Sequence, residues 1–162
     1  MLVKQFMSQS VISCHLDDNL SQAAKLMWEY DCGVVPVVAQ DGRVLAMLTD
    51  RDICMAAYTQ GKVLSEIAVR VAMSQELYSC YPEDTLEQAE QLMRDYQVRR
   101  LPVVDRQGQA VGILSLNDLA CALTRQHPSC QGAGNGISNS SMAQTLAAVG
   151  AHRIETATHK LV

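Results

Sequence analysis

The spacing of apolar residues predicts two amphipathic helices far apart in the chain. Apolar positions in residues 20–28 recur every three or four residues, and the same spacing returns in residues 86–96. An acidic residue stands just before each helix, Asp18 in one case and Asp84 in the other. We expect these two residues to cap the helices or to act as first-turn acids that complement the helix dipole.

Predicted strands surround each of these helices in the same order. A short extended run precedes the helix, and two strands joined by a glycine-containing turn follow it. These strands are predicted at residues 11–14, 34–38 and 44–48, and again at 77–80, 100–104 and 110–114. The run at 34–38 is continuously apolar, as expected of a strand buried on both faces. A closing helix is predicted to start at Thr49 or Ser115.

The two series of elements are copies of one unit. When the sequence is shifted by 66 residues, residues 3–53 align with residues 69–119 without a gap, and about 19 of the 51 positions are identical. One copy alone is too small to bury its apolar face, so we expect the two to pack about a pseudo-twofold axis. The sequence therefore divides into repeat 1 (1–66), repeat 2 (67–127) and a Gly/Ser-rich linker and tail (128–162) of unknown role.

The tail matches neither copy. Residues 128–141 are rich in Gly, Ser and Asn, which is typical of a flexible linker. The following residues predict a weak helix with Met142, Leu146 and Val149 on one side, and then an alternating, strand-like run at 153–158. A disordered tail and a segment that docks on a partner subunit both remain open.

Composition and charge narrow the function classes. Hydrophobic residues make up 48 % of the chain and charged residues 19 %, which suits a packed core and not a disordered chain. The net charge of −4 lacks the basic face that nucleic-acid binding needs. The sequence has no apolar run of about eighteen residues that would span a membrane. Because residues 1–6 also lack the apolar core of a signal peptide, we expect a cytoplasmic protein.

The six cysteines predict neither disulfides nor a metal site. None forms a C-x-x-C pair, so we expect free, mostly buried thiols in a reducing compartment. Cys14 precedes His15, but neighbouring residues on a strand point to opposite faces and do not form a nucleophile–base pair. Known hydrolase, Walker and dinucleotide motifs do not occur in the sequence, so we expect no enzyme. A thiol- or metal-responsive role for His127 and Cys130 is a weaker alternative, because two ligands do not make a site.

The most informative residues lie where each closing helix starts. Repeat 1 has Thr49 and Asp52 there, and repeat 2 has Ser115 and Asp118. A hydroxyl followed three residues later by an acid predicts a capping box. The start of a helix also offers free N–H groups that suit a phosphate, and the acid can accept two hydrogen bonds from a ribose diol. Capping and ligand binding are compatible with each other.

Together these features resemble a pair of cystathionine-β-synthase (CBS) domains. The resemblance covers about residues 1–124 and rests on V-V-P-V-V and L-P-V-V-D in the second strands and on M-L-T-D-R-D and G-I-L-S-L-N-D at the helix starts. It implies an α+β fold of two β-α-β-β-α units packed sheet to sheet, with two clefts between them. Such pairs often bind AMP, ADP, ATP, S-adenosylmethionine or NAD. The resemblance therefore implies a non-enzymatic sensor or regulatory module that forms a flat homodimer through its helices.

The resemblance also implies roles for particular residues. We name the expected clefts by their acids: cleft 1 at Thr49 and Asp52, and cleft 2 at Ser115 and Asp118. The acids would hold ribose hydroxyls, and the hydroxyl residues would contact phosphate or ribose. Apolar residues of the first strands would flank adenine, namely Val11, Cys14, Leu77 and Cys80.

The two clefts are expected to differ in charge. By resemblance, the second strand of repeat 2 brings Arg99 and Arg100 toward cleft 1, where guanidinium groups suit phosphate. Cleft 2 would receive Gly33 and Val34, which carry no charge. We therefore expect cleft 1 to be the better site for a phosphorylated ligand. Arg51 is either a phosphate ligand there or an exposed arginine in local ion pairs.

Two further positions leave alternatives open. Repeat 1 has Ala46 where repeat 2 has Gly112 and the family prefers glycine, so the methyl group either crowds a ligand or tightens the packing. Trp28 has Arg94 as its counterpart and is expected to be partly exposed, either in an interface or over its own core. The alternative function is a structural or adaptor dimerisation module with empty clefts that acts through a protein partner.

Overall fold

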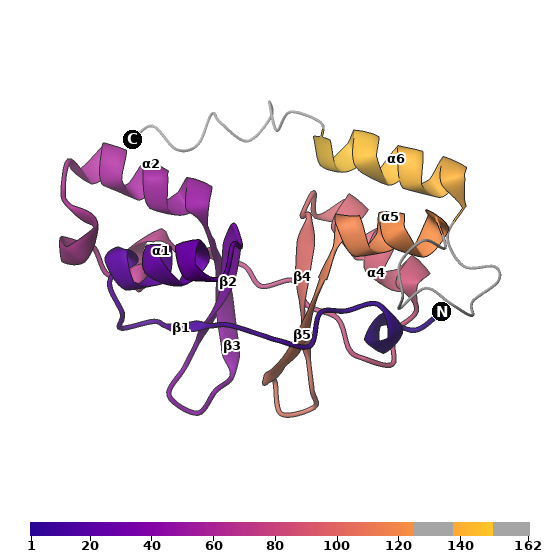
Figure 1. Cartoon of the computed structure of the whole chain (residues 1–162), viewed down its shortest axis with the longest axis horizontal. Helices are drawn as coiled ribbons and strands as arrows, with labels where there is room; N and C mark the ends of the chain where they lie inside the picture. Colours follow the sequence, from indigo (N-terminus) through magenta and orange to yellow (C-terminus); the bar gives the residue numbers. More distant parts are fainter. Residues whose placement is uncertain (125–137, 151–162) are drawn as a thin grey trace.

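The computed structural model describes residues 1–124 and 138–150 of the chain (Figure 1). Repeat 1 contains β1 (Cys14–His15), α1 (Leu20–Glu29), β2 (Val34–Val38), β3 (Val44–Thr49) and α2 (Asp50–Gln60). Repeat 2 contains α4 (Leu86–Asp95), β4 (Arg100–Val104), β5 (Ala110–Ser115) and α5 (Leu116–Thr124). The remaining elements are η1 (Val3–Gln5), η2 (Leu64–Glu66), α3 (Val69–Ala72) and α6 (Asn139–Gly150).

The structure confirms the α+β fold and its sheet-to-sheet packing. Each repeat forms an antiparallel pair, β2 with β3 and β4 with β5, and the two small sheets face each other with the helices outside (Figure 1). The hairpin turns meet between the sheets, where the Val44 N–H donates to the Gly108 carbonyl at 2.9 Å. Three valines, one from each of β2, β3 and β4, form a small apolar cluster beside this contact: Val38, Val44 and Val104.

The first strands are much shorter than predicted. Of residues 11–14, only Cys14 joins a strand, which runs parallel to β2, and in the second copy Cys80 makes a single bridge to Val103. The cause is a crossing of the chain between the repeats. Ser8 pairs with Ile113 in repeat 2, whereas Cys14 already pairs with repeat 1, so the intervening residues connect the two sheets.

Each sequence repeat contributes its first turn to the core of the other. Val3 in η1 and Phe6 directly after it are buried among the core residues of repeat 2. Ile67 and Val69 are buried in the core of repeat 1 in the same way, and the Leu20 N–H donates to the Ile67 carbonyl at 2.9 Å. The two packed units are therefore tied together by exchanged segments as well as by the sheet contact.

The predicted caps of α1 and α4 are one residue off. Asn19 caps α1 by accepting from the Gln22 N–H at 3.0 Å, and Thr85 caps α4 in the same way. Asp18 and Asp84 instead accept from backbone N–H groups three residues earlier and close the turn before each helix. Asn19 and Thr85 therefore provide the caps, whereas Asp18 and Asp84 stabilise the preceding turns.

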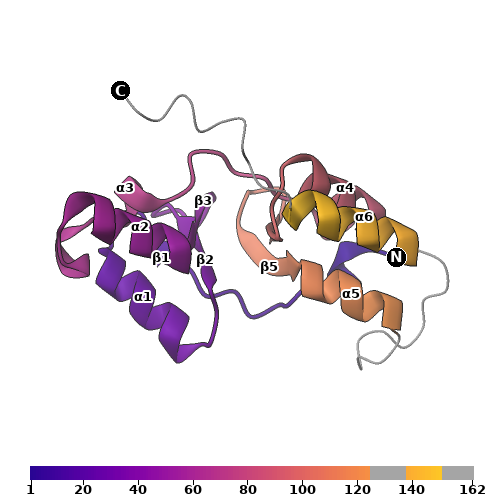
Figure 2. The same ribbon diagram turned by 90° about the horizontal axis from the view of Figure 1, so that it is seen from above.

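The tail corrects two expectations. Residues 139–141, which were predicted to be linker, form the first turn of α6. This helix packs on α4 and α5 of its own chain, as Figures 1 and 2 both show. Leu146 is 52 % exposed, whereas Thr145 is fully buried and takes the predicted place of Leu146 on the packed side.

Met142 and Val149 are buried in the core of repeat 2, as the predicted apolar side requires. The strand-like run at 153–158, together with His127 and Cys130, lies outside the described residues.

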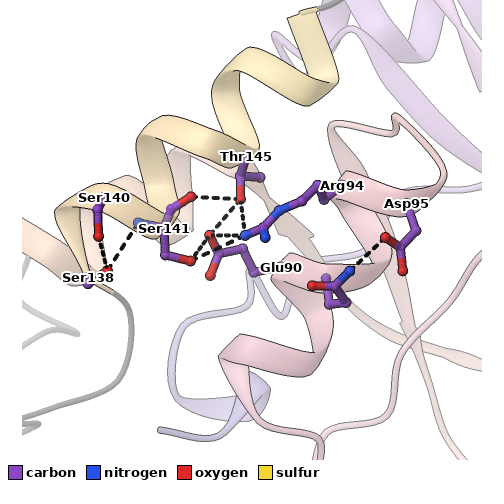
Figure 3. A network of polar contacts seen from close by, with 8 residues as sticks. Glu90, Arg94, Asp95, Ser138, Ser140, Ser141 and Thr145 are labelled. Carbon is purple, nitrogen blue, oxygen red and sulfur yellow. Dashed lines mark hydrogen bonds and ion pairs between the residues drawn. The ribbon is translucent and has the colours of Figure 1, made fainter.

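A polar network attaches α6 to α4 (Figure 3). Glu90 is 2 % exposed, and its Oε1 accepts hydrogen bonds from the Ser141 hydroxyl at 2.7 Å and the Thr145 hydroxyl at 2.5 Å. Arg94 lies one turn further along α4 and pairs with the same carboxylate at 3.2 Å. The carboxylate is thus compensated by one cation and two hydroxyl donors, which buried charge requires.

Candidate ligand-binding site

The start of α2 has the predicted capping-box geometry. Asp52 Oδ2 accepts hydrogen bonds from the Thr49 hydroxyl at 2.6 Å and from the Thr49 N–H at 2.9 Å. The Asp52 N–H in turn donates to the Thr49 hydroxyl at 3.2 Å. Because strand β3 leads directly into helix α2, these bonds fix the acid at the junction of sheet and helix.

The start of α5 repeats this geometry almost atom for atom. Asp118 Oδ2 accepts from the Ser115 hydroxyl at 2.6 Å and from the Ser115 N–H at 2.7 Å. The Asp118 N–H donates to the Ser115 hydroxyl at 3.2 Å. The repeat thus preserves the arrangement of the site and not only its residue types.

Both acids keep an oxygen that the cap does not use. The hydrogen bonds that Asp52 and Asp118 accept within the described part of the chain all end on Oδ2. Both residues are half-buried at the junction of strand and helix. A carboxylate held in this way can accept further hydrogen bonds from hydroxyl donors of a ligand.

The backbone places Arg99 and Arg100 beside the cap of their own repeat. The Leu116 N–H, at the start of α5, donates to the Arg99 carbonyl at 3.0 Å, and Arg100 pairs with Ser115 across the sheet. Gly33 takes the corresponding place in repeat 1, where its carbonyl accepts from the Asp50 N–H at 3.2 Å. Both arginines are exposed. The reach of their side chains toward cleft 1 stays a prediction.

Arg51 is exposed at the start of α2. Its N–H donates to the Asp50 carboxylate at 2.7 Å. Its guanidinium takes part in none of the ion pairs found across residues 1–124 and 138–150. The structure therefore agrees with the prediction that Arg51 is exposed, but not with the prediction that its guanidinium forms local ion pairs.

Cys14 and Cys80 lie inside the cores of their repeats. Both are about 1 % exposed. Burial raises the pKa of the Cys14 thiol to about 11 and that of Cys80 to about 12, and the carboxylates of Asp18 and Asp84 add to the rise. These thiols are neutral packing groups, which agrees with their matching positions in the two repeats. Val11 and Leu77 are half-buried, and Leu77 packs between the sheets.

An aromatic pair next to Leu77 went unnoticed in the sequence. The rings of Tyr78 and Tyr96 stack with their centroids 3.9 Å apart, and the Tyr78 hydroxyl donates to Glu76. Tyr78 has Ile12 as its counterpart, so repeat 2 carries an aromatic ring in the run that was expected to flank adenine. The difference between Ile12 and Tyr78 was the sequence signal that could have revealed this aromatic ring.

The crossing chain packs closely against Gly112. A Cβ atom at this position would lie 2.5 Å from Met7 Sδ and 3.0 Å from the Ser8 carbonyl oxygen. Ala46, its counterpart, is about 1 % exposed in the core of repeat 1. The methyl group of Ala46 therefore contributes to packing, which is one of the two alternatives that the sequence left open.

Three further observations concern a surface hollow, metal ligands and membrane spans among the described residues. A surface hollow of about 330 Å³ is lined by Asp84, Gln88, Gln91 and Leu92, none of which was predicted to bind ligand. Within the described ranges, no three His, Cys, Asp or Glu side chains are grouped so as to hold a metal ion. None of the helices described has both the length and the apolar character needed to cross a bilayer.

Comparison with known families agrees with the duplicated architecture. The model of the CBS domain matches residues 3–58 and again residues 64–125. The chain belongs to the CBS-domain family. A CBS domain-containing protein of Bacillus subtilis, YhcV, is 40 % identical over 137 residues, which cover 85 % of this chain and 93 % of that protein.

Solved CBS structures share the fold. The CBS-domain protein ATU1752 from Agrobacterium tumefaciens is 28 % identical and superposes with a TM-score of 0.68, covering 76 % of this chain and 99 % of that one. The CBS domain pair of protein MJ0100, solved in complex with 5′-methylthioadenosine and S-adenosyl-L-methionine, is 24 % identical with a TM-score of 0.68 and covers the same shares of both chains. The chain is therefore a CBS pair in fold, with α6 added to its second repeat.

Proposed function

We propose that this CBS pair is a non-enzymatic regulatory module that binds an adenine nucleotide, or a related adenosyl ligand, in cleft 1 and cleft 2. The observation that carries the proposal is the pair of matching caps, in which Asp52 and Asp118 each keep one carboxylate oxygen free of the cap bonds. Two vicinal ribose hydroxyls are donors, and a free carboxylate oxygen can accept a hydrogen bond from each of them. Regulation would follow if the ligand prefers one arrangement of the two repeats over another.

The adenosyl class is supported by a relative and by the charge near the caps. MJ0100, which shares the fold, binds two adenosyl compounds. Arg51, Arg99 and Arg100 are exposed at or near the helix starts, where a phosphate would meet guanidinium groups. We retain the expectation that cleft 1 prefers phosphorylated ligands, because Arg51 has Asn117 as its counterpart in cleft 2.

The adenine would have to contact cleft residues other than the core thiols. Cys14 and Cys80 are closed in by their cores, so a ligand would meet them through their backbone. Val11 and Leu77 are half-buried and are the apolar side chains of these runs that remain as flanking groups. In cleft 2, Tyr78 would add an aromatic face for the base.

Thermal unfolding with a set of ligands tests the proposal. Purified protein freed of bound nucleotide would be heated with AMP, ADP, ATP, S-adenosylmethionine or NAD, beside the variants Asp52→Asn and Asp118→Asn. Asparagine keeps one acceptor for the cap and loses the charge and the second acceptor. A ligand at 100 times its Kd should add about 2.7 kcal/mol to the free energy of unfolding.

Asp31→Asn is the matched control, because Asp31 is exposed at φ 48°, a conformation that asparagine also adopts. We expect at least one ligand to raise the Tm of the wild type and of Asp31→Asn, and the rise to shrink in Asp52→Asn or Asp118→Asn. An equal rise in all variants would place the ligand elsewhere. No rise with any ligand would contradict the proposal.

A further inference from the structure

The turn that follows α4 holds a residue in an uncommon backbone conformation. Gln97 has φ 53°, in the left-handed region, and Asp31 has φ 48° at the equivalent turn after α1. Both turns are closed in the same way, because the N–H of the next residue, Val98 or Cys32, donates to a carbonyl in the last part of the helix at 3.0 or 2.9 Å. Aspartate adopts left-handed φ more readily than glutamine. The backbone of this turn therefore does not explain why repeat 2 has glutamine there.

The Gln97 side chain reaches α6. Its Nε2 donates to the Ala148 carbonyl, near the end of that helix, at 3.2 Å. Repeat 1 has no counterpart of α6 among the described residues: Trp28 is 88 % exposed, whereas Arg94, which takes its place in repeat 2, donates to two hydroxyl groups of α6. Aspartate at position 97 would have no N–H donor and would be one methylene shorter. The bond to α6 thus accounts for the glutamine.

Two separate contacts attach α6 to repeat 2. The first is the network in which Ser141 donates to Glu90 (Figure 3), and the second is the bond from Gln97 to Ala148. Both contacts join residues 51 positions apart in the chain, so α6 runs beside α4 in the same direction. The first contact holds the middle of α4, whereas the second holds the turn that follows it. A residue kept at left-handed φ by such a contact indicates a function for the turn.

The turn leads directly into the two arginines that are expected to contact phosphate. Arg99 and Arg100 follow Gln97 closely in the chain, and both are exposed. The Arg99 carbonyl accepts from the Leu116 N–H at 3.0 Å, at the start of α5. The segment 97–100 is therefore held by α6 at one end and by the start of α5 at the other.

We propose that Gln97 is a positioning residue that couples the docking of α6 to the binding of a phosphorylated ligand by Arg99 and Arg100. The coupling rests on the proposed function, which places a phosphate near these arginines. Docked α6 holds the turn in the form that presents both guanidinium groups, whereas released α6 lets the turn adopt other conformations. A ligand that prefers the first form shifts the equilibrium toward it. By linkage, ligand binding then strengthens the docking of α6 by the same factor.

Equilibrium dialysis of nucleotide-free protein against labelled ATP and S-adenosylmethionine tests the coupling. Gln97→Asn suits the turn but is too short to reach Ala148. The double variant Ser141→Ala/Thr145→Val weakens the other attachment of α6, at Glu90. We expect each to bind ATP at least about fivefold more weakly, the lower end of typical coupling factors. Binding of S-adenosylmethionine, which has no phosphate, should not change.

Hydrogen exchange measures the reciprocal effect. Saturating ATP should slow the exchange of the α6 amides in the wild type by the same factor as the loss of ATP affinity, and should not slow it in Gln97→Asn. Asp31→Asn is the matched control, because it makes the equivalent change at the turn of repeat 1. We expect it to bind ATP as the wild type does.

The outcomes separate the coupling from the proposed function. Weaker ATP binding by both variants, with S-adenosylmethionine binding and the circular dichroism spectrum unchanged, supports the coupling. Variants that bind ATP as tightly as the wild type, or that lose both ligands equally, would overturn the coupling and leave the proposed function intact. A wild type that binds S-adenosylmethionine but not ATP would do the same. A wild type that binds neither ligand would overturn the proposed function and the coupling with it.

Discussion

Thr145 Oγ1 lies 2.5 Å from Glu90 Oε1, and this hydrogen bond joins α6 to α4 through two residues that are 55 positions apart in the chain. Glu90 is almost fully buried, so its carboxylate depends on the donors that α6 and Arg94 supply. The second repeat is therefore more than a copy of the first. Repeat 2 holds α6 through the Glu90 carboxylate, whereas repeat 1 has Ala24 at the equivalent position.

Replacing this hydroxyl should weaken the attachment of α6. Thr145→Val keeps the shape of the side chain and removes one donor from the buried carboxylate, so we expect a loss of about 1–3 kcal/mol in the free energy of unfolding. Urea unfolding measures it. Ser140→Ala is the control, because Ser140 is exposed and bonds only to Ser138 among the contacts of the described residues. Equal stability of Thr145→Val and the wild type would show that the bond is dispensable.

The tail shows where the sequence misleads. The serines that begin α6 look like linker residues, since Ser and Asn are typical of flexible segments. Their helical role depends on Glu90, a partner far away in the sequence. Thr145 was overlooked for the same reason: a hydroxyl belongs on a buried helix face only when an acceptor awaits it. Hydrophobic spacing placed Met142 and Val149 correctly because their burial requires nothing more than apolar surroundings.

The two caps should contribute to stability independently of any ligand. We expect Thr49→Ala to lower the free energy of unfolding by about 1 kcal/mol, because it removes the acceptor for the Asp52 N–H. Ser115→Ala should cost a similar amount. Chemical denaturation of the two variants and of the double variant measures both terms. A neutral effect in either repeat would mean that its cap does not hold the helix start in solution.

Gly112→Ala should be more damaging than the reverse change in repeat 1. The added methyl group would meet Met7 Sδ and the Ser8 carbonyl, and overpacking of this kind typically costs about 1–3 kcal/mol. Ala46→Gly should cost only about 0.5–1 kcal/mol. Thermal unfolding of both variants measures the difference. Adding Met7→Ala to Gly112→Ala should recover part of the loss, and no recovery would mean that Met7 is not the obstacle.

The buried thiols should make stability fall at alkaline pH. Folding raises the pKa of Cys14 to about 11 and of Cys80 to about 12, while the unfolded thiols ionise near their usual pKa of about 8.5–9. Only the unfolded state loses these protons between those values, so the stabilisation is complete below about pH 8.5 and decreases as pH rises toward 11. The slope should approach about 1.4 kcal/mol per pH unit for each thiol.

Unfolding free energies from pH 8 to 10.5 measure this effect. The Cys14→Ala/Cys80→Ala double variant should show a flatter decline than the wild type, whereas Cys54→Ala, which changes an exposed thiol, should not. Identical slopes in all three proteins would show that the two core thiols do not titrate as described.

The sequence predicted the two units and the caps of α2 and α5 because those features are local or repeated. A hydroxyl and an acid three residues apart define a cap wherever a strand ends, so Thr49 and Asp52 could be located without a structure. The exchange of first turns between the repeats was not foreseen, because it depends on which core Val3 reaches. The stack of Tyr78 on Tyr96 was missed for a similar reason, since ring contacts between a loop and a helix end have no fixed spacing.

Equilibrium dialysis of the purified protein against labelled AMP, ATP and S-adenosylmethionine tests the central claim most directly, because it counts bound ligand without relying on stability. The account predicts saturable binding of at least one ligand to the wild type. It also predicts loss of that binding in the Asp52→Asn/Asp118→Asn double variant, with Asp31→Asn unchanged. An absence of binding by nucleotide-free wild type, or undiminished binding by the double variant, would contradict the assignment of these two acids to a ligand site.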